Sequence, residues 1–287
     1  MDIGAWGFSK HMSIITPAIL QNLYKPLSTS HKGQNGRLLV IAGSHRYHGS
    51  LLLAIKVVSR IVDLVYVLVD DFNRKLIDDL KKESSVFIPV AKNDLGECVE
   101  RVDALLIGPG LDGDRNITKI LKKILKKYYD KKVVLDAGAL RIVDPLDLHS
   151  NCVVTPHAQE FEHLFDCEPT PENVVKMAKY YQCAVVLKGK VDYVSDGKEL
   201  AENTTGNAGM TKGGTGDVLA GLIAALIAKN PPFLSAQAGV YLNGLAGDRL
   251  YKEYGTFYNA EDLIDELGRV WKQNINSSPI PGERDGG

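Results

Sequence analysis

Cysteine, methionine and tryptophan are scarce in this sequence, with 4 Cys, 4 Met and 2 Trp among 287 residues. The cysteines lie far apart and include no C-x-x-C pair, which argues against a zinc knuckle and a disulfide framework. Such cysteine usage is typical of a reducing, cytoplasmic compartment. Cys152 and Cys183 lie in apolar runs, and we expect both to be small core residues.

The sequence also lacks a charge excess and a long hydrophobic run. Its 34 basic and 35 acidic residues leave a formal charge of -1, so neither nucleic acid nor an anionic membrane is an expected partner. The most apolar stretch, residues 218–228, is too short to cross a bilayer and predicts a buried helix. The first dozen residues show no targeting signature. With 45% apolar and 24% charged residues, the composition is that of a soluble globular protein.

Apolar strand-like runs alternate with helical segments from Arg37 onward. This rhythm is typical of an α/β fold in which helices cover a mostly parallel sheet. We expect one domain over residues 1–287, with a core of about 14–272 and peripheral ends. The strand-like runs are RLLVIAG, LVYVLV, VFIPV, DALLIG, VVLDAG, CVVTP and VVLKG.

Five of these runs end in loops of small or polar residues. Ligands of open α/β sheets bind beyond the carboxyl ends of the strands, so five such loops predict one cleft. Any one loop alone is explained as well by a tight turn; their convergence favours a site. The loops are residues 42–44, 108–110, 136–138, 155–157 and 188–190.

A glycine-rich segment, GGTGD at residues 213–217, runs directly into the apolar helix. Its backbone amides and the positive end of the helix dipole suit phosphate oxygens. Asp217 is either an ordinary helix-start carboxylate or a general base that takes the proton of an attacking hydroxyl. Beside an anion socket we favour the base, and we expect Gly214, Thr215 and Gly216 of the same loop to take part in catalysis with it.

Two better-known phosphate motifs match this sequence poorly. Residues 209–214 have the spacing of a Walker A loop, but Thr215 stands where its lysine belongs. Residues 108–113 form a G-x-G-x-x-G, yet they lie mid-chain, and Pro109 removes an amide that would face a phosphate. P-loop and Rossmann dinucleotide sites are therefore disfavoured.

Six motifs in order carry a family resemblance. They are SHKG at 30–33, GRLLVIAGS at 36–44, GPGL at 108–111, TPHxxE at 155–160, LKG at 187–189 and GGTGDVLAG at 213–221. On these motifs the chain resembles the NAD(P)H-hydrate dehydratases, the carbohydrate-kinase-like domain of nicotinamide nucleotide repair proteins. The resemblance implies a ribokinase-like three-layer αβα sandwich.

The resemblance further implies dehydration of the S form of hydrated NADH or NADPH, through a phosphorylated intermediate, with ADP or ATP as donor and Mg²⁺ as cofactor. A lone loop histidine is usually only solvated, whereas the surrounding motif favours a contact for His157. Glu160 would reach the metal through water. The implied contacts with the hydrate are Ser50, Gly110, His157 and Asp217, and those with the nucleotide are Lys188, Gly189, Lys190, Val191, Asp192 and Gly216.

Some positions depart from the family pattern, which usually has Ala at Ser50, Gly at Asp112 and Gly at Gln159. We expect a separate protein to supply the epimerase activity, and we expect this chain to form a homo-oligomer, a tetramer being one option. Two other functions stay open. One is a ribokinase-like kinase for a thiazole or pyrimidine alcohol, and the other is a nucleotide sensor without turnover.

Overall fold

The computed structural model describes residues 12–71, 73–112 and 115–275. In this part of the chain, ten strands form one sheet in the order β1-β10-β9-β8-β7-β6-β5-β2-β3-β4. All neighbouring pairs are parallel except the two that involve β9. The strands are β1 (Met12–Ile14), β2 (Arg37–Ile41), β3 (Leu64–Val69), β4 (Ile88–Ala91), β5 (Ala104–Ile107), β6 (Lys132–Leu135), β7 (Cys152–Val154), β8 (Ala184–Leu187), β9 (Asp192–Ser195) and β10 (Leu200–Asn203).

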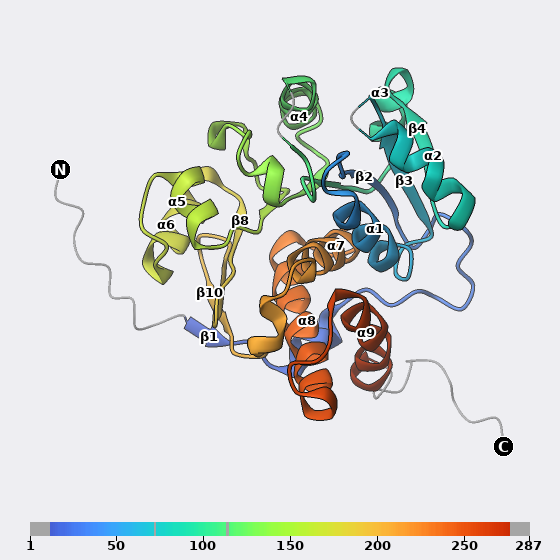
Figure 1. Cartoon of the computed structure of the whole chain (residues 1–287). Coiled ribbons are helices and arrows are strands. Elements are labelled where there is room, and N and C mark those ends of the chain that lie inside the picture. The colour runs from blue at the N-terminus through green and yellow to red at the C-terminus, as the bar shows by residue number, and fades with distance from the viewer. Residues whose placement is uncertain (1–11, 72, 113–114, 276–287) are drawn as a thin grey trace, which may run out of the picture.

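Helices cover both faces of this sheet (Figure 1). Side chains alternate along a strand, so Leu38 and Val40 of β2 enter one apolar core while Leu39 and Ile41 enter the other. The first core includes α1 (His48–Val58), α2 (Arg74–Glu83), α7 (Thr215–Ile227), α8 (Pro232–Tyr254) and α9 (Ala260–Ile275). The second includes α3 (Leu95–Arg101), α4 (Arg115–Lys127), α5 (Ala158–Phe165) and α6 (Pro171–Tyr181).

Helices α1 and α7 pack against each other through small residues. A Cβ on Gly221 would lie 3.4 Å from the Cα of Ala54, so the two backbones approach closely at this crossing. Every residue of α7 after Asp217 is buried, as expected for the apolar run. The crossing fixes the two helix N-termini, which carry Ser50 and Asp217, relative to each other.

Short 3-10 turns complete the described chain. They are η2 (Pro17–Asn22), η3 (Lys92–Asp94), η4 (Ala137–Ala139), η5 (Pro145–Asp147) and η6 (Ala208–Thr211). The predicted mostly parallel α/β fold is confirmed, and the seven expected strand runs correspond to β2 through β8. Strands β1, β9 and β10 lie outside the runs expected from the sequence.

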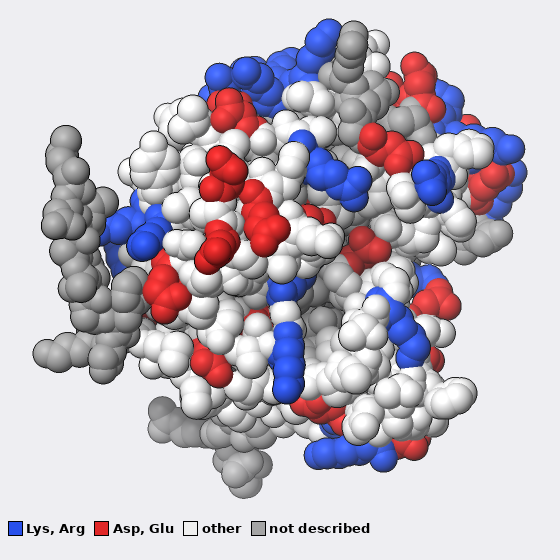
Figure 2. Space-filling model, turned by 60° about the vertical axis from the view of Figure 1, so that its left-hand side comes forward, with Lys and Arg blue, Asp and Glu red and all other residues white. Residues whose placement is uncertain are grey.

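The expectation for two of the cysteines also agrees with the structure. Cys152 and Cys183 are buried. The exposed lysines of α4 gather on one face of that helix, and basic side chains line the upper edge of the molecule at the height of α4 (Figure 2). Among the described residues, no helix has the length and apolarity needed to span a bilayer.

Candidate active site

The five expected loops meet at one edge of the sheet. They follow β8, β7, β6, β5 and β2, which are consecutive neighbours and all parallel. Backbone hydrogen bonds join adjacent loops: the Gly43 amide donates to the Pro109 carbonyl at 2.8 Å, and the Lys188 amide donates to the Pro156 carbonyl at 2.9 Å. The carboxyl ends of five strands thus form one continuous floor, where open α/β sheets bind ligands.

The glycine-rich loop forms the start of α7. Gly214 is the N-cap residue with φ +95°, a left-handed conformation that favours glycine. The Thr215 hydroxyl donates to the Met210 carbonyl at 2.7 Å, so this side chain supports the loop. The first-turn amides of a helix lack intrahelical carbonyl partners, which leaves the amides of Gly216 and Asp217 suited to an anion.

Asp217 lies in the first turn of α7, next to Ser50 at the start of α1. Burial raises the pKa of its carboxyl from the ordinary 3.8 to about 6, and the charge of Asp136 adds to this rise. A side-chain hydrogen bond with Ser50 and the charge of Lys188 act in the opposite direction. A carboxylate with a pKa of about 6 is ionised at neutral pH and is a stronger base than an exposed aspartate.

Lys188 provides the positive charge of the site. Its Nζ lies 2.8 Å from Asp136 Oδ1 and 3.9 Å from Glu160 Oε2, and its side chain is 19% exposed. Burial alone would lower the pKa of Lys188, but Asp136 and Glu160 outweigh burial and raise it. A Cβ on Gly216 would lie 3.6 Å from this Nζ, which places the cation beside the start of α7.

Asp136 also belongs to this group. Its side chain is 2% exposed and accepts hydrogen bonds from Lys188 Nζ and, at 2.8 Å, from Thr155 Oγ1. The only signal in the sequence was its place at the end of a strand-like run. Asp136 is part of the site because it lies at this edge of the sheet and pairs with the largely buried Lys188.

His157 and Glu160 form a capping box at the start of α5. The His157 amide donates to Glu160 Oε2 at 3.0 Å, while the Glu160 amide donates to His157 Nδ1 at 3.3 Å. The imidazole is half exposed at the floor of the site, whereas the Glu160 side chain is only 10% exposed. The motif that predicts a ligand contact for His157 therefore also has a helix-capping role.

The remaining predicted contacts lie on either side of Asp217. Gly110 has φ +69°, and a Cβ there would lie 2.5 Å from the Tyr47 carbonyl oxygen and 2.9 Å from Ser50 Cβ, so β5 and α1 meet at this point. On the other side, residues 188–191 connect β8 to β9. The Gly189 amide donates to Asp192 Oδ1 at 3.0 Å, which fixes the turn. Lys190 is exposed there, and Val191 is half-buried.

The described residues contain no group of three or more His, Cys, Asp or Glu side chains arranged to hold a metal ion. Glu160 is already engaged by the His157 amide and faces Lys188. The described side chains therefore offer a magnesium ion no ready-made set of carboxylate ligands.

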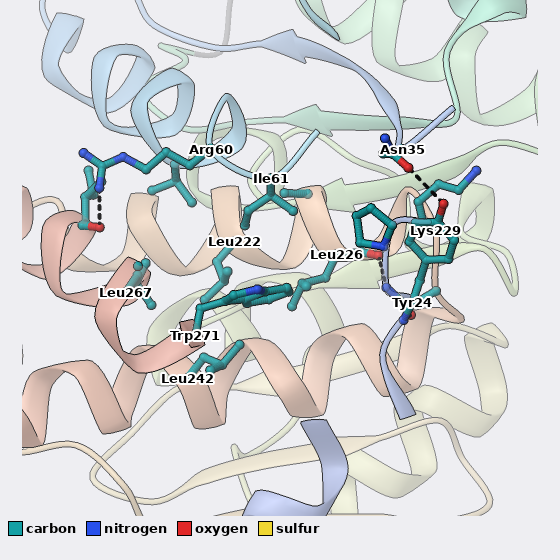
Figure 3. A pocket seen from close by; sticks show the side chains of 16 residues that line it. Tyr24, Asn35, Arg60, Ile61, Leu222, Leu226, Lys229, Leu242, Leu267 and Trp271 are labelled. Carbon is teal, nitrogen blue, oxygen red and sulfur yellow. Dashed lines mark hydrogen bonds between the residues drawn. The ribbon is translucent and has the colours of Figure 1, made fainter. Parts of the chain in front are cut away.

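A separate cavity of about 230 Å³ lies near the C-terminal ends of α1 and α7 and is also lined by α9 (Figure 3). Trp271 stands at its centre among Leu222, Leu226 and Leu242. The cavity is lined mainly by apolar side chains, and none of the predicted catalytic or binding residues is among them. It does not belong to the candidate active site.

The ten-stranded, mostly parallel sheet of the described residues, with helices on both faces, has a ribokinase-like fold. A ribokinase-like superfamily protein from Enterococcus faecalis matches this structure with a TM-score of 0.82 and 26% identity, and the match covers 95% of this chain and 99% of that one. The NAD(P)H-hydrate dehydratase family model matches residues 38–269. The chain belongs to that family.

Two curated relatives are named as an NAD(P)H-hydrate repair enzyme and an NAD(P)H-hydrate dehydratase. The bifunctional NAD(P)H-hydrate repair enzyme Nnr of Methanocaldococcus jannaschii is 40% identical over 88% of this chain, and the chain spans 51% of that relative's length. The ADP-dependent (S)-NAD(P)H-hydrate dehydratase of Cenarchaeum symbiosum is 36% identical over 85% of this chain, and the match covers 91% of that relative. The chain thus spans about half of the bifunctional relative and nearly all of the monofunctional one.

Proposed function

We propose that this protein dehydrates the S form of hydrated NADH or NADPH at the expense of ADP or ATP. The observation that carries this proposal is the half-buried Asp217 carboxylate at the start of α7, beside free first-turn amides and Lys188. Membership of the NAD(P)H-hydrate dehydratase family supplies the substrate class.

In the first step, the hydrate hydroxyl oxygen bonds to the terminal phosphorus of the donor. Asp217 accepts the hydroxyl proton, and the bond to the departing nucleotide breaks, which releases AMP from ADP or ADP from ATP. The amides of Gly216 and Asp217 hold the negative charge of the transferring group, and Lys188 balances it. In the second step, the carbon–oxygen bond breaks, phosphate leaves, and loss of a proton from the neighbouring carbon restores the reduced nicotinamide.

Two sides of the floor receive the two substrates in this proposal. Ser50, Gly110 and His157 face the hydrate, and residues 188–192 with Gly216 face the nucleotide. Mg²⁺ bound with the nucleotide would neutralise phosphate charge, and Glu160 would orient its water ligands. We propose that a separate protein, an epimerase, supplies the S form of the hydrate to this enzyme.

The test follows the reduced-nicotinamide absorbance of hydrated NADH and hydrated NADPH with ADP, with ATP, with neither nucleotide, and with chelator added. We expect absorbance to return only with nucleotide and metal, together with one phosphate per turnover. Equal rates without nucleotide would contradict the phosphorylation step. A stable phosphorylated product from a thiazole or pyrimidine alcohol, with no dehydration, would instead favour the small-alcohol kinase.

A further inference from the structure

The loop between β2 and α1 carries a cationic and aromatic group that the proposed chemistry leaves unused. Residues 45–48, His-Arg-Tyr-His, are all exposed. The Arg46 guanidinium lies over the Tyr47 ring, with its Cζ 5.3 Å from the ring centroid. A guanidinium stacked on an aromatic ring keeps its N–H groups free at its edges, where they suit phosphate oxygens.

This loop is fixed to the active site by its backbone. The Tyr47 amide donates to Ser44 Oγ at 3.2 Å, and the Gly43 amide donates to the Pro109 carbonyl at 2.8 Å. The Tyr47 carbonyl oxygen contacts Gly110, and Ser50 follows one helical turn later with its hydrogen bond to Asp217. Arg46 therefore stands on the same side of Asp217 as the residues assigned to the hydrate.

Arg46 supplies positive charge on the side of the site that is assigned to the hydrate. Lys188 and Lys190 follow β8, whereas Arg46 follows β2, and three strands separate β8 from β2 in the sheet. Among the residues for which the structure gives side chains, no Asp or Glu forms an ion pair with Arg46. A hydrated dinucleotide carries a pyrophosphate, and its NADP form carries a further 2′-phosphate, so its own side of the floor needs a cation.

We propose that Arg46, held on Tyr47, binds a phosphate group of the hydrated dinucleotide. This inference rests on the proposed function, and it adds a specificity determinant to it. The guanidinium offers paired N–H donors to phosphate oxygens, and Tyr47 limits the rotamers of the arginine. The pyrophosphate and the 2′-phosphate present the same chemistry to this group.

The experiment compares Arg46→Ala and Arg46→Lys with the wild type and with Arg101→Ala. Arg101 is an exposed arginine at the end of α3, on the opposite edge of the sheet, and serves as the matched control. Loss of a charge-assisted hydrogen bond predicts a KM for the hydrate about tenfold higher in Arg46→Ala. The kcat and the KM for ADP should stay within about twofold of wild type, and Arg46→Lys should recover only part of the loss.

The two hydrates distinguish the two phosphates. An equal rise in KM for hydrated NADH and hydrated NADPH assigns Arg46 to the pyrophosphate, and a rise for hydrated NADPH alone assigns it to the 2′-phosphate. An unchanged KM for both hydrates, or a rise in the KM for ADP instead, overturns the proposal while turnover itself upholds the proposed function.

A binding measurement that needs no turnover separates the two claims further. NADPH has the same phosphates as its hydrate, and its fluorescence reports binding to wild type, Arg46→Ala and Arg101→Ala directly. Weaker binding in Arg46→Ala alone supports the phosphate contact even if the hydrates are not turned over. Equal NADPH affinity in all three proteins, or no NADPH binding by the wild type, overturns it.

Discussion

Replacing Asp217 by Asn should abolish turnover and at the same time stabilise the protein. The folded state binds the Asp217 proton more tightly than the unfolded chain does, because the carboxyl pKa is about 6 in the fold and 3.8 ordinarily. Stability from this group is therefore fully present below pH 3.8 and is lost as the pH rises toward 6. Above that range, folding carries the cost of keeping a partly buried charge.

The size of this cost follows from the pKa difference. One pKa unit corresponds to about 1.4 kcal/mol, so the ionised carboxylate costs about 3 kcal/mol at pH 8 and about 2 kcal/mol at pH 5. Asn keeps the shape of the side chain and carries no charge. The Asp217→Asn variant should therefore gain up to these amounts in free energy of unfolding, with the larger gain at pH 8.

Urea denaturation of both proteins at the two pH values measures this difference, because contributions from titrating groups that do not interact with Asp217 cancel between them. Turnover of the hydrate should fall at least about 100-fold, as expected for loss of a general base. The wild-type kcat/KM should rise with pH up to about 6 and level off above it. The assignment of a charged, half-buried base would be refuted by either of two results. One is a variant less stable than wild type at pH 8, and the other is a difference in free energy of unfolding that does not change with pH.

Three further substitutions test other parts of the site. Lys188→Met leaves the buried Asp136 without its cation, so it should lower the free energy of unfolding by about 3 kcal/mol, and adding Asp136→Asn should recover most of that loss in urea denaturation; additive losses would contradict the pairing. Gly216→Val fills the space beside Lys188 Nζ and should weaken ADP binding about tenfold or more without unfolding the chain; unchanged affinity by calorimetry removes this loop from the nucleotide site. Gly110→Ala places a methyl group against the α1 loop and should raise the KM for the hydrate more than that for ADP; equal effects on both would argue against separate sides.

The central sheet was predictable because its strands are buried on both faces. The segments LLVI of β2 and ALLI of β5 are apolar throughout, and their order along the chain indicates parallel pairing. The strands β9 and β10, with sequences DYVS and LAEN, are short and polar, so no periodicity distinguishes them from a loop. These strands form by pairing with neighbours in the sheet, β9 antiparallel to β8 and β10, and β10 parallel to β1. That pairing depends on the tertiary fold and leaves no local pattern in the sequence.

The site was predictable where one segment carries the chemistry and less so where distant segments meet. The GGTGD loop combines glycines, a helix start and a carboxylate within five residues. The ion pair of Lys188 with Asp136 joins residues 52 positions apart, and the contact of Ser50 with Asp217 joins residues even further apart. Neither contact leaves a pattern in the local sequence, because the sheet order alone brings those segments together.

The packing of α1 against α7 also determines at which stage of folding the candidate active site can form. Helix α1 belongs to the first fifth of the chain, while α7 begins at Thr215. Contacts of such large sequence separation close late, because a long loop must be ordered before they form. During synthesis or refolding, strands β2 to β7 can pair before Asp217 of α7 contacts Ser50 of α1. A nascent chain that ends before α7 lacks Asp217, and under the proposed function we expect it to be inactive.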